Sequence, residues 1–110
     1  MGMLKRASRL VLESQQTAPD GGGGLTIAWA QAGVLWGEIE PRSGSESAPG
    51  ARPTARVTHR IRLRREPGSG RRPRPDQRLR LGERIFAIHG VADTPDGEQV
   101  LLWVEEGPLS

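Results

Sequence analysis

The stretch Val57-Thr58-His59-Arg60-Ile61-Arg62-Leu63-Arg64 decides the fold class, because apolar and polar side chains alternate along it almost without interruption. Successive side chains of a β-strand point to opposite faces, so this period of two predicts a strand with one buried face. The inward set is Val57, His59, Ile61 and Leu63, and the outward set is Thr58, Arg60, Arg62 and Arg64.

Further strands are predicted on both sides of this one. The apolar run Arg9–Leu12 predicts a first strand, which a polar stretch at 14–20 leads into a turn of four glycines at 21–24. The segments 25–29 and 34–40 are either two strands or one long strand bent at Ala32-Gly33. Later strands are predicted at 77–81, 84–91 and 99–105, with a turn at Gly82-Glu83 and a hairpin connection at 93–97. We therefore predict a mainly β protein, a small antiparallel β-barrel or sandwich of six to seven strands.

Length and composition limit the remaining possibilities. The 110 residues allow a single domain, 1–110, with 1–7 and 107–110 as flexible ends. Leu, Ile, Val and Phe number 23, near the ~20% level below which disorder becomes the default, so the core must be thin. The 15 Gly and 9 Pro exclude a large helical bundle, and the absence of Cys excludes disulfides, thiolate metal sites and cysteine nucleophiles. No apolar run approaches the ~18 residues of a membrane span, so we expect a soluble, intracellular protein without membrane contact.

The net charge of +3 is distributed unevenly along the chain. Residues 52–84 hold twelve arginines against three acids, whereas residues 85–110 hold five acids and neither Lys nor Arg. A basic middle and an acidic end suit either a polyanion or head-to-tail contact between copies of the chain. In the second case the acidic 93–106 end of one copy would meet the basic 52–84 region of the next.

Candidate catalytic and metal-binding residues are few. His59 lies on the apolar face of its predicted strand, which is typical of a packed histidine. His89 lies near Asp93, but two histidines without any cysteine provide few metal ligands. The glycines at 21–24 lack the Gly-Lys-Ser/Thr ending of a phosphate-binding loop. We therefore predict no enzymatic activity, no catalytic residue, no metal site and no cofactor.

The arginine rows are the most informative candidate surface. They form either a basic surface for DNA or a neighbouring subunit, or a solvated sheet face whose arginine bias reflects genome composition. No aromatic side chain is interleaved with them, which disfavours single-strand recognition. The basic set is Arg60, Arg62, Arg64, Arg71, Arg72, Arg74, Arg78 and Arg80, and the candidate packing or interface anchors are Trp29, Trp36, Phe86 and Trp103.

The order of several sequence features is similar to that of a known family. The features are Asp20–Gly24, Trp29, Val34–Pro41, Ser43–Glu46, Val57–Arg64, Pro75–Arg80, Arg84–Val91 and Leu101–Glu106. Together they cover roughly residues 8–106. On these residues the chain resembles the phage head–tail joining family, the small head-closure or stopper proteins of long-tailed phages and gene transfer agents.

The resemblance implies a structural ring protein in the neck of a virion or phage-like particle, assembled in the cytoplasm of the bacterial host. Its ring, a hexamer or alternatively a dodecamer, would lie below the portal and adaptor and carry the tail through tail terminator or tail tube proteins. Double-stranded DNA would pass through it without sequence-specific contacts. The loop Pro41–Ala55 would enter the channel and help to retain the DNA, with Arg42, Ser43, Gly44, Glu46, Gly50 and Arg52 as its candidate residues. Alternatives are another neck ring component, adaptor or tail terminator, and a basic β-barrel that binds nucleic acid.

Overall fold

The computed structural model describes residues 6–42, 48, 50, 55–64 and 72–107, and every regular element among them is a β-strand. The prediction of a mainly β protein is therefore confirmed, with six strands. They are β1 (Ser8–Pro19), β2 (Leu25–Pro41), β3 (His59–Arg64), β4 (Arg78–Leu81), β5 (Arg84–Asp93) and β6 (Gln99–Glu106).

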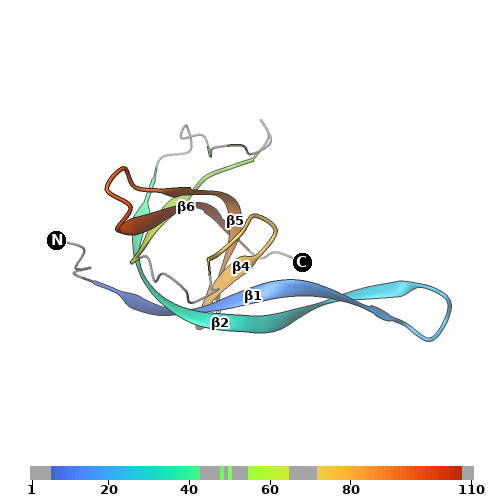
Figure 1. Ribbon diagram of the computed structural model, residues 1–110. Coiled ribbons are helices and arrows are strands. Elements are labelled where there is room, and N and C mark those ends of the chain that lie inside the picture. The colour runs from blue at the N-terminus through green and yellow to red at the C-terminus, as the bar shows by residue number, and fades with distance from the viewer. Residues whose placement is uncertain (1–5, 43–47, 49, 51–54, 65–71, 108–110) are drawn as a thin grey trace.

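The six strands form one antiparallel sheet that closes on itself. The order around the barrel is β1-β2-β3-β6-β5-β4, and β4 pairs with β1 through Leu79 opposite Leu12. Hairpins join β1 to β2, β4 to β5 and β5 to β6, while β3 crosses to pair with β6. Closure leaves the strands of the barrel without open edges, and Figure 1 shows the resulting ring of strands.

Alternation along the strands fills the barrel with aliphatic side chains around one phenylalanine. Ile61 and Leu63 are buried as predicted, and the His59 ring lies edge-on to Phe86 with 5.5 Å between the ring centroids. Val57 is also buried, but it precedes β3, which begins at His59 and is two residues shorter than the sequence predicts. The core cluster is Leu10, Leu12, Ile61, Leu63, Leu79, Phe86, Ile88, Val100, Leu102 and Val104.

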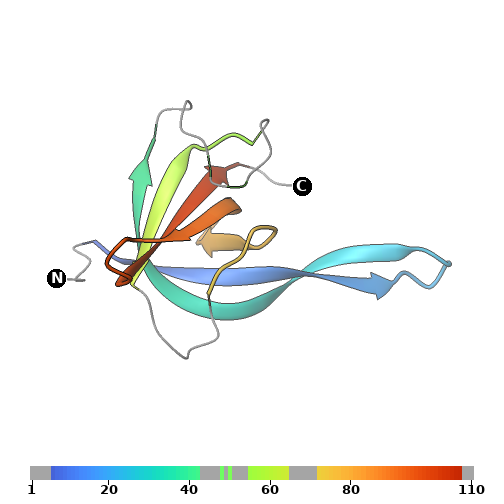
Figure 2. The same ribbon diagram turned by 45° about the horizontal axis from the view of Figure 1, so that its top comes forward.

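The longest elements, β1 and β2, belong only partly to the barrel. The polar segment Ser14–Pro19, which the sequence suggests leads into a turn, continues β1 and pairs with Leu25–Ala30. Residues 14–30 therefore form a two-stranded arm that projects from the barrel (Figures 1 and 2) and makes the molecule 53 Å long against 33 and 25 Å. The open question at Ala32-Gly33 is resolved in favour of one long strand.

A register shift separates the arm from the barrel. Leu12 pairs with Gly33 but Glu13 pairs with Gln31, so Ala32 is the extra residue of a β-bulge in β2. The extra residue exchanges the faces of β2 on which odd-numbered and even-numbered side chains lie. Trp29 and Ile27 in the arm consequently lie on the same outward face as Val34 and Trp36 on the barrel, although their spacing in the sequence assigns them to opposite faces.

Gly37 is a point of close packing in the barrel wall. A Cβ atom at this position would lie 2.5 Å from Leu63 Cδ2, 3.0 Å from Ile61 Cγ2 and 3.2 Å from Leu10 Cδ1. Replacing Gly37 with alanine should therefore overpack the core and lower the free energy of unfolding by about 1–3 kcal/mol. Urea denaturation measures this difference, with Gly107→Ala as the control because a Cβ there meets nothing within 4 Å. Equal stability of the two variants would contradict the packing at Gly37.

Candidate functional site

The arm is nearly free of charge. From Ser14 to Gly37 the only ionisable side chain is Asp20, at the tip. Its Oδ1 accepts hydrogen bonds from the backbone N–H groups of Gly22 (2.7 Å) and Gly24 (3.0 Å), and these bonds lower the pKa of Asp20. Gly21 and Gly23 have φ values of 86° and 90°, a conformation that only glycine adopts readily. The glycine run is therefore a turn that the Asp20 carboxylate stabilises. This agrees with the sequence, in which the run lacks the Gly-Lys-Ser/Thr ending of a phosphate-binding loop.

The base of the arm is held to the barrel by a buried carboxylate. Glu13, 5% exposed, lies 2.7 Å from Arg78 Nε and 3.3 Å from a terminal nitrogen of Arg80. The Arg78 guanidinium also stacks 4.1 Å above the ring of Trp29, which belongs to the arm. One arginine thus bonds a barrel strand and an arm residue at the same time, and this fixes the direction in which the arm leaves the barrel.

A second contact reinforces this junction. The buried side chain of Gln77 donates a hydrogen bond to Ser14 Oγ (2.7 Å) and accepts one from the Arg74 backbone N–H (2.7 Å). Sequence reasoning identified neither Glu13 nor Gln77. A single glutamate or glutamine has no periodic signal, and the bonds that join Gln77 to Ser14 and Glu13 to Arg78 each span more than 60 residues.

The predicted basic set does not form one surface. Arg60, Arg62 and Arg64 lie on β3, whereas Arg78 and Arg80 lie on β4, three strands away in either direction around the barrel. Alternation within β3 is as predicted, since Ile61 and Leu63 point inward and the arginines outward. The barrel therefore separates arginines that are close in sequence, and Arg71 lies outside the described residues.

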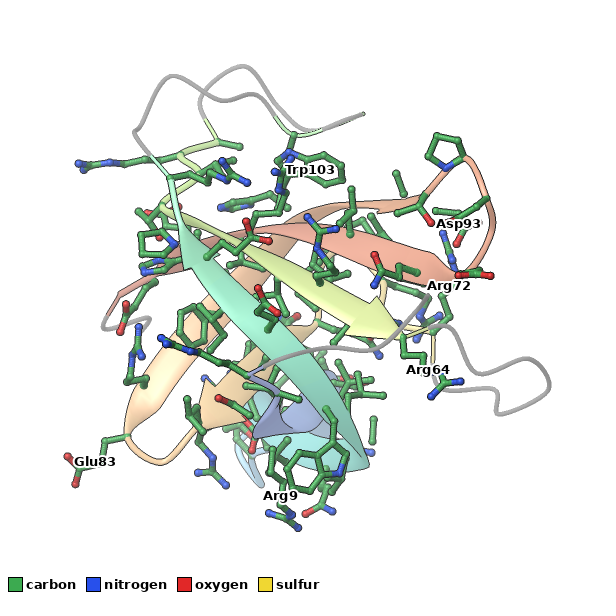
Figure 3. The ribbon with its side chains drawn as sticks, turned by 90° about the vertical axis from the view of Figure 1, so that its left-hand side faces the viewer. Arg9, Arg64, Arg72, Glu83, Asp93 and Trp103 are labelled. Atoms are coloured by element: carbon green, nitrogen blue, oxygen red, sulfur yellow. The ribbon has the colours of Figure 1, made fainter. Side chains whose placement is uncertain are left out.

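Most of the described arginines in this set are compensated within the chain. Arg62 bonds Glu40 (3.3 Å) and Gln99 (3.2 Å), and Arg42 bonds the other oxygen of Glu40 (2.9 Å). Arg72 pairs with Asp93, and Figure 3 shows the two side chains together beside the β5–β6 turn. Arg64 and Arg74 have no ion pair among the described residues, and the backbone of Arg74 is bonded to Gln77.

The acidic end of the chain is also compensated internally. Glu106 bonds Arg84 through both oxygens (2.8 and 3.0 Å), which lowers the pKa of Glu106 and raises that of Arg84. Glu105 lies 2.9 Å from His89. Asp96 accepts hydrogen bonds from the Thr94 hydroxyl and the Glu98 N–H, and these lower the pKa of Asp96. Two carboxylates of the acidic end, Asp93 and Glu106, therefore pair with arginines of the basic middle within a single copy, which weakens the argument for a charge contact between copies.

The long loop after β2 begins and ends at residues that are hydrogen-bonded to each other. Pro41 pairs with His59, and the Arg42 N–H donates to the Thr58 carbonyl (2.9 Å), so the two ends of the loop are adjacent. Of the candidate loop residues, Arg42 is half-buried beside Glu40 and Gly50 is exposed with φ 71°. Ser43, Gly44, Glu46 and Arg52 lie outside the described residues.

The four aromatic anchors have different environments. Phe86 is fully buried in the core, and Trp103 is buried in the barrel wall. Trp29 is half-buried beneath Arg78 at the base of the arm. Trp36, in contrast, is 58% exposed on the outside of the barrel, so it is not a packing centre.

The described part of the chain shows neither a metal-binding cluster nor a membrane-spanning helix. Residues 6–42, 48, 50, 55–64 and 72–107 contain no cluster of three or more His, Asp or Glu side chains that could hold a metal ion. Within the same ranges no helix has the length and apolar character needed to cross a bilayer.

Breaking the junction at Glu13 should be costly. Glu13→Gln keeps the size of the side chain but leaves Arg78, itself largely buried, without its counter-ion, and we expect a loss of about 3–5 kcal/mol in the free energy of unfolding. Arg84→Ala, which breaks an exposed pair, should cost at most about 1 kcal/mol. Urea denaturation of both variants tests this, and a Glu13→Gln variant as stable as Arg84→Ala would exclude a buried junction.

Comparison with known proteins identifies relatives along almost the whole chain. The sequence pattern of the phage head completion protein family matches residues 5–107. A chain from the virion of a native gene transfer agent particle is 36% identical and superposes with a TM-score of 0.67, over 94% of this chain and 98% of that one. Protein SF1141 from Shigella flexneri 2a has the same fold at 18% identity, with a TM-score of 0.66 and 94% of each chain covered. No curated protein sequence matches the chain.

Proposed function

The chain belongs to the phage head completion protein family, and from this membership we propose that it is a head-closure ring subunit of a tailed phage or gene transfer agent. It is a structural virion protein that acts in joining head to tail. The finer proposal is that several copies, six in our preferred arrangement, form a ring below the portal and adaptor. This ring continues the DNA channel, retains packaged DNA and provides the surface to which the tail attaches.

The observation that carries the proposal is the family match over residues 5–107, which includes both the barrel and the arm. The chain from the gene transfer agent virion supports it, because that chain is 36% identical and is covered over 98% of its length. We propose that the protein acts without catalysis, through its surfaces alone.

The loop between β2 and β3 is the proposed channel element. Its ends are joined by the pairing of Pro41 with His59 and of Arg42 with Thr58, so it can extend from the barrel without disturbing the core. The charged residues of Pro41–Ala55 are Arg42, Glu46 and Arg52, which are few for its length. A channel through which DNA must slide benefits from few fixed phosphate contacts, because each one adds affinity.

The internal charge pairing weighs against the alternative of a nucleic-acid-binding barrel. Such a surface needs free cations grouped on one face. Here β3 and β4 are separated around the barrel, and Arg62, Arg72 and Arg78 are bonded to carboxylates. Tight DNA binding by the isolated protein, falling steeply with salt and lost on neutralising Arg60, Arg62 and Arg64, would favour the alternative.

The proposed function is tested with particles that lack the protein. Heads assembled without this chain should package DNA, lose it again and carry no tail, and supplying the chain in trans should restore both properties. DNase protection of the packaged DNA and electron micrographs measure these outcomes. Particles that keep their DNA and their tails without the chain would overturn the proposal.

Deleting Ser43–Arg52 separates the channel role from the fold. The deletion leaves residues 53–57 to connect Arg42 with Thr58, and five residues are sufficient for a hairpin loop. We expect an unchanged circular dichroism spectrum, particles that incorporate the variant, and DNA that becomes accessible to nuclease. A variant that fails to fold would instead make this segment part of the core, and one that retains DNA normally would exclude a channel role for it.

A further inference from the structure

The large hydrophobic side chains that the described structure leaves exposed are all on β2. Leu25 is 70% and Ile27 64% exposed near the tip of the arm, and Trp36 is 58% exposed where β2 joins the barrel. We call Leu25 and Ile27 the tip patch, and Trp36 with Val34 the root patch. The bulge at Ala32 exchanges the faces occupied by odd-numbered and even-numbered side chains, so both patches lie on the outward face of one continuous strand. Exposed apolar patches of this kind mark interaction surfaces.

The twist of the arm turns the two patches in different directions. Two-stranded antiparallel ribbons twist strongly. In Figures 1 and 2 the strands β1 and β2 exchange sides between the barrel and the tip, and both views agree. The face that bears Trp36 at the root is therefore rotated about the long axis of the arm before it bears Leu25 and Ile27. Two copies in similar orientation can consequently bring the tip patch of one against the root patch of the other.

Beyond its base, the arm pairs with no further strand among the described residues. β4 pairs with β1 only at Val11–Glu13 and β3 pairs with β2 only from Gly37 onward, so neither edge of the arm has a neighbouring strand among the residues that the structure describes. Natural sheets protect such edges with charged residues, yet the arm carries none on either strand. An isolated two-stranded ribbon is marginally stable in water. An uncharged, unprotected ribbon with an apolar face is typical of a segment covered by another protein.

The charges at the two ends of the arm suit a second copy of this chain as the covering surface. Phosphate is an unsuitable ligand, because no cation lies between Ser14 and Gly37. The tip carries the Asp20 carboxylate, whose lowered pKa keeps it ionised. The root carries Arg9, which pairs with Trp36 across the strands, is exposed, and points away from the barrel in Figure 3. The tip is thus apolar and anionic, and the root apolar and cationic.

We propose that the tip patch of each copy packs on the root patch of the next copy, with Asp20 facing Arg9. The contact joins two different surfaces, so it is heterologous, and repeating it under rotation closes a ring. This inference deepens the proposed function and rests on it. It also assigns a role to the arm that the internal charge pairing of the barrel leaves available.

The absence of cysteine from the chain permits a direct test by disulfide cross-linking. Positions 27 and 36 lie about 30 Å apart along extended β2, far beyond the roughly 7 Å that a disulfide allows between Cα atoms, so a bond between them must join two copies. The variant Ile27→Cys/Trp36→Cys should form a ladder of covalent oligomers on oxidation, both as purified protein at high concentration and in assembled particles. Non-reducing gel electrophoresis measures the ladder.

Matched variants control for accidental contacts. Ala28 is exposed beside Ile27 on the opposite face of the arm, so Ala28→Cys/Trp36→Cys should give no ladder. Ile27→Cys mixed with Trp36→Cys should give dimers only. Dimers formed by Ile27→Cys alone would reveal a tip-to-tip contact and overturn the proposal, as would equal ladders from both double variants or no link in either setting.

A second measurement does not depend on cysteine chemistry. Ile27→Asp should abolish self-association in sedimentation experiments while Ala28→Asp leaves it intact, and both should melt at the same temperature because both sites are exposed. If Ile27→Asp associates as Ala28→Asp does, the tip patch is not the contact. Mass spectrometry of purified particles separates the two proposals. A particle that contains the chain without the 27–36 link overturns only this inference, whereas particles without the chain overturn the proposed function.

Discussion

The buried carboxylate of Glu13 is the interaction on which the arrangement of this molecule depends. It lies at the register shift where β1 leaves the barrel, and it bonds Arg78 and Arg80 from the strand that closes the barrel. Arg78 in turn stacks on Trp29 of the arm. Barrel closure and arm direction are therefore linked through the same four side chains, Glu13, Arg78, Arg80 and Trp29. A buried charge of this kind costs desolvation energy, and it is tolerated here because each of its oxygens has a cationic partner.

Within the described residues, several arginines and carboxylates of a single copy compensate one another. The basic middle of the sequence folds against the acidic end, with Arg72 on Asp93 and Arg84 on Glu106. In the proposed ring, hydrophobic contact rather than long-range attraction would therefore hold the copies together. An assembly surface that depends little on exposed ion pairs is less sensitive to salt.

The proposed assembly gives the thin core and the long arm a common explanation. The barrel encloses about ten apolar side chains around Phe86, which suffices for a small closed sheet, while Leu25, Ile27 and Trp36 remain in solvent. An exposed indole and two exposed aliphatic residues are costly in a free monomer and favourable in a complex that buries them. The apolar content that is low for one chain is therefore adequate when neighbouring copies or neck proteins complete the burial.

The sequence by itself determined the class of fold and most strand positions, because strand alternation and glycine turns are local signals. The pattern in Ile61-Arg62-Leu63 and the turns at Gly82 and Gly97 needed no distant residue to be interpreted. Only the tertiary structure decided that Ser14–Pro19 is a strand, that Trp36 is exposed, and that Arg60 and Arg78 lie on different sides. The polar strand has no buried face to give it a period, and one bulge residue at Ala32 reverses the face of every side chain beyond it. Pairing across the barrel separates arginines that are close in sequence and joins Glu13 to a partner 65 residues away. These features depend on register and closure, which are properties of the whole sheet and not of any one segment.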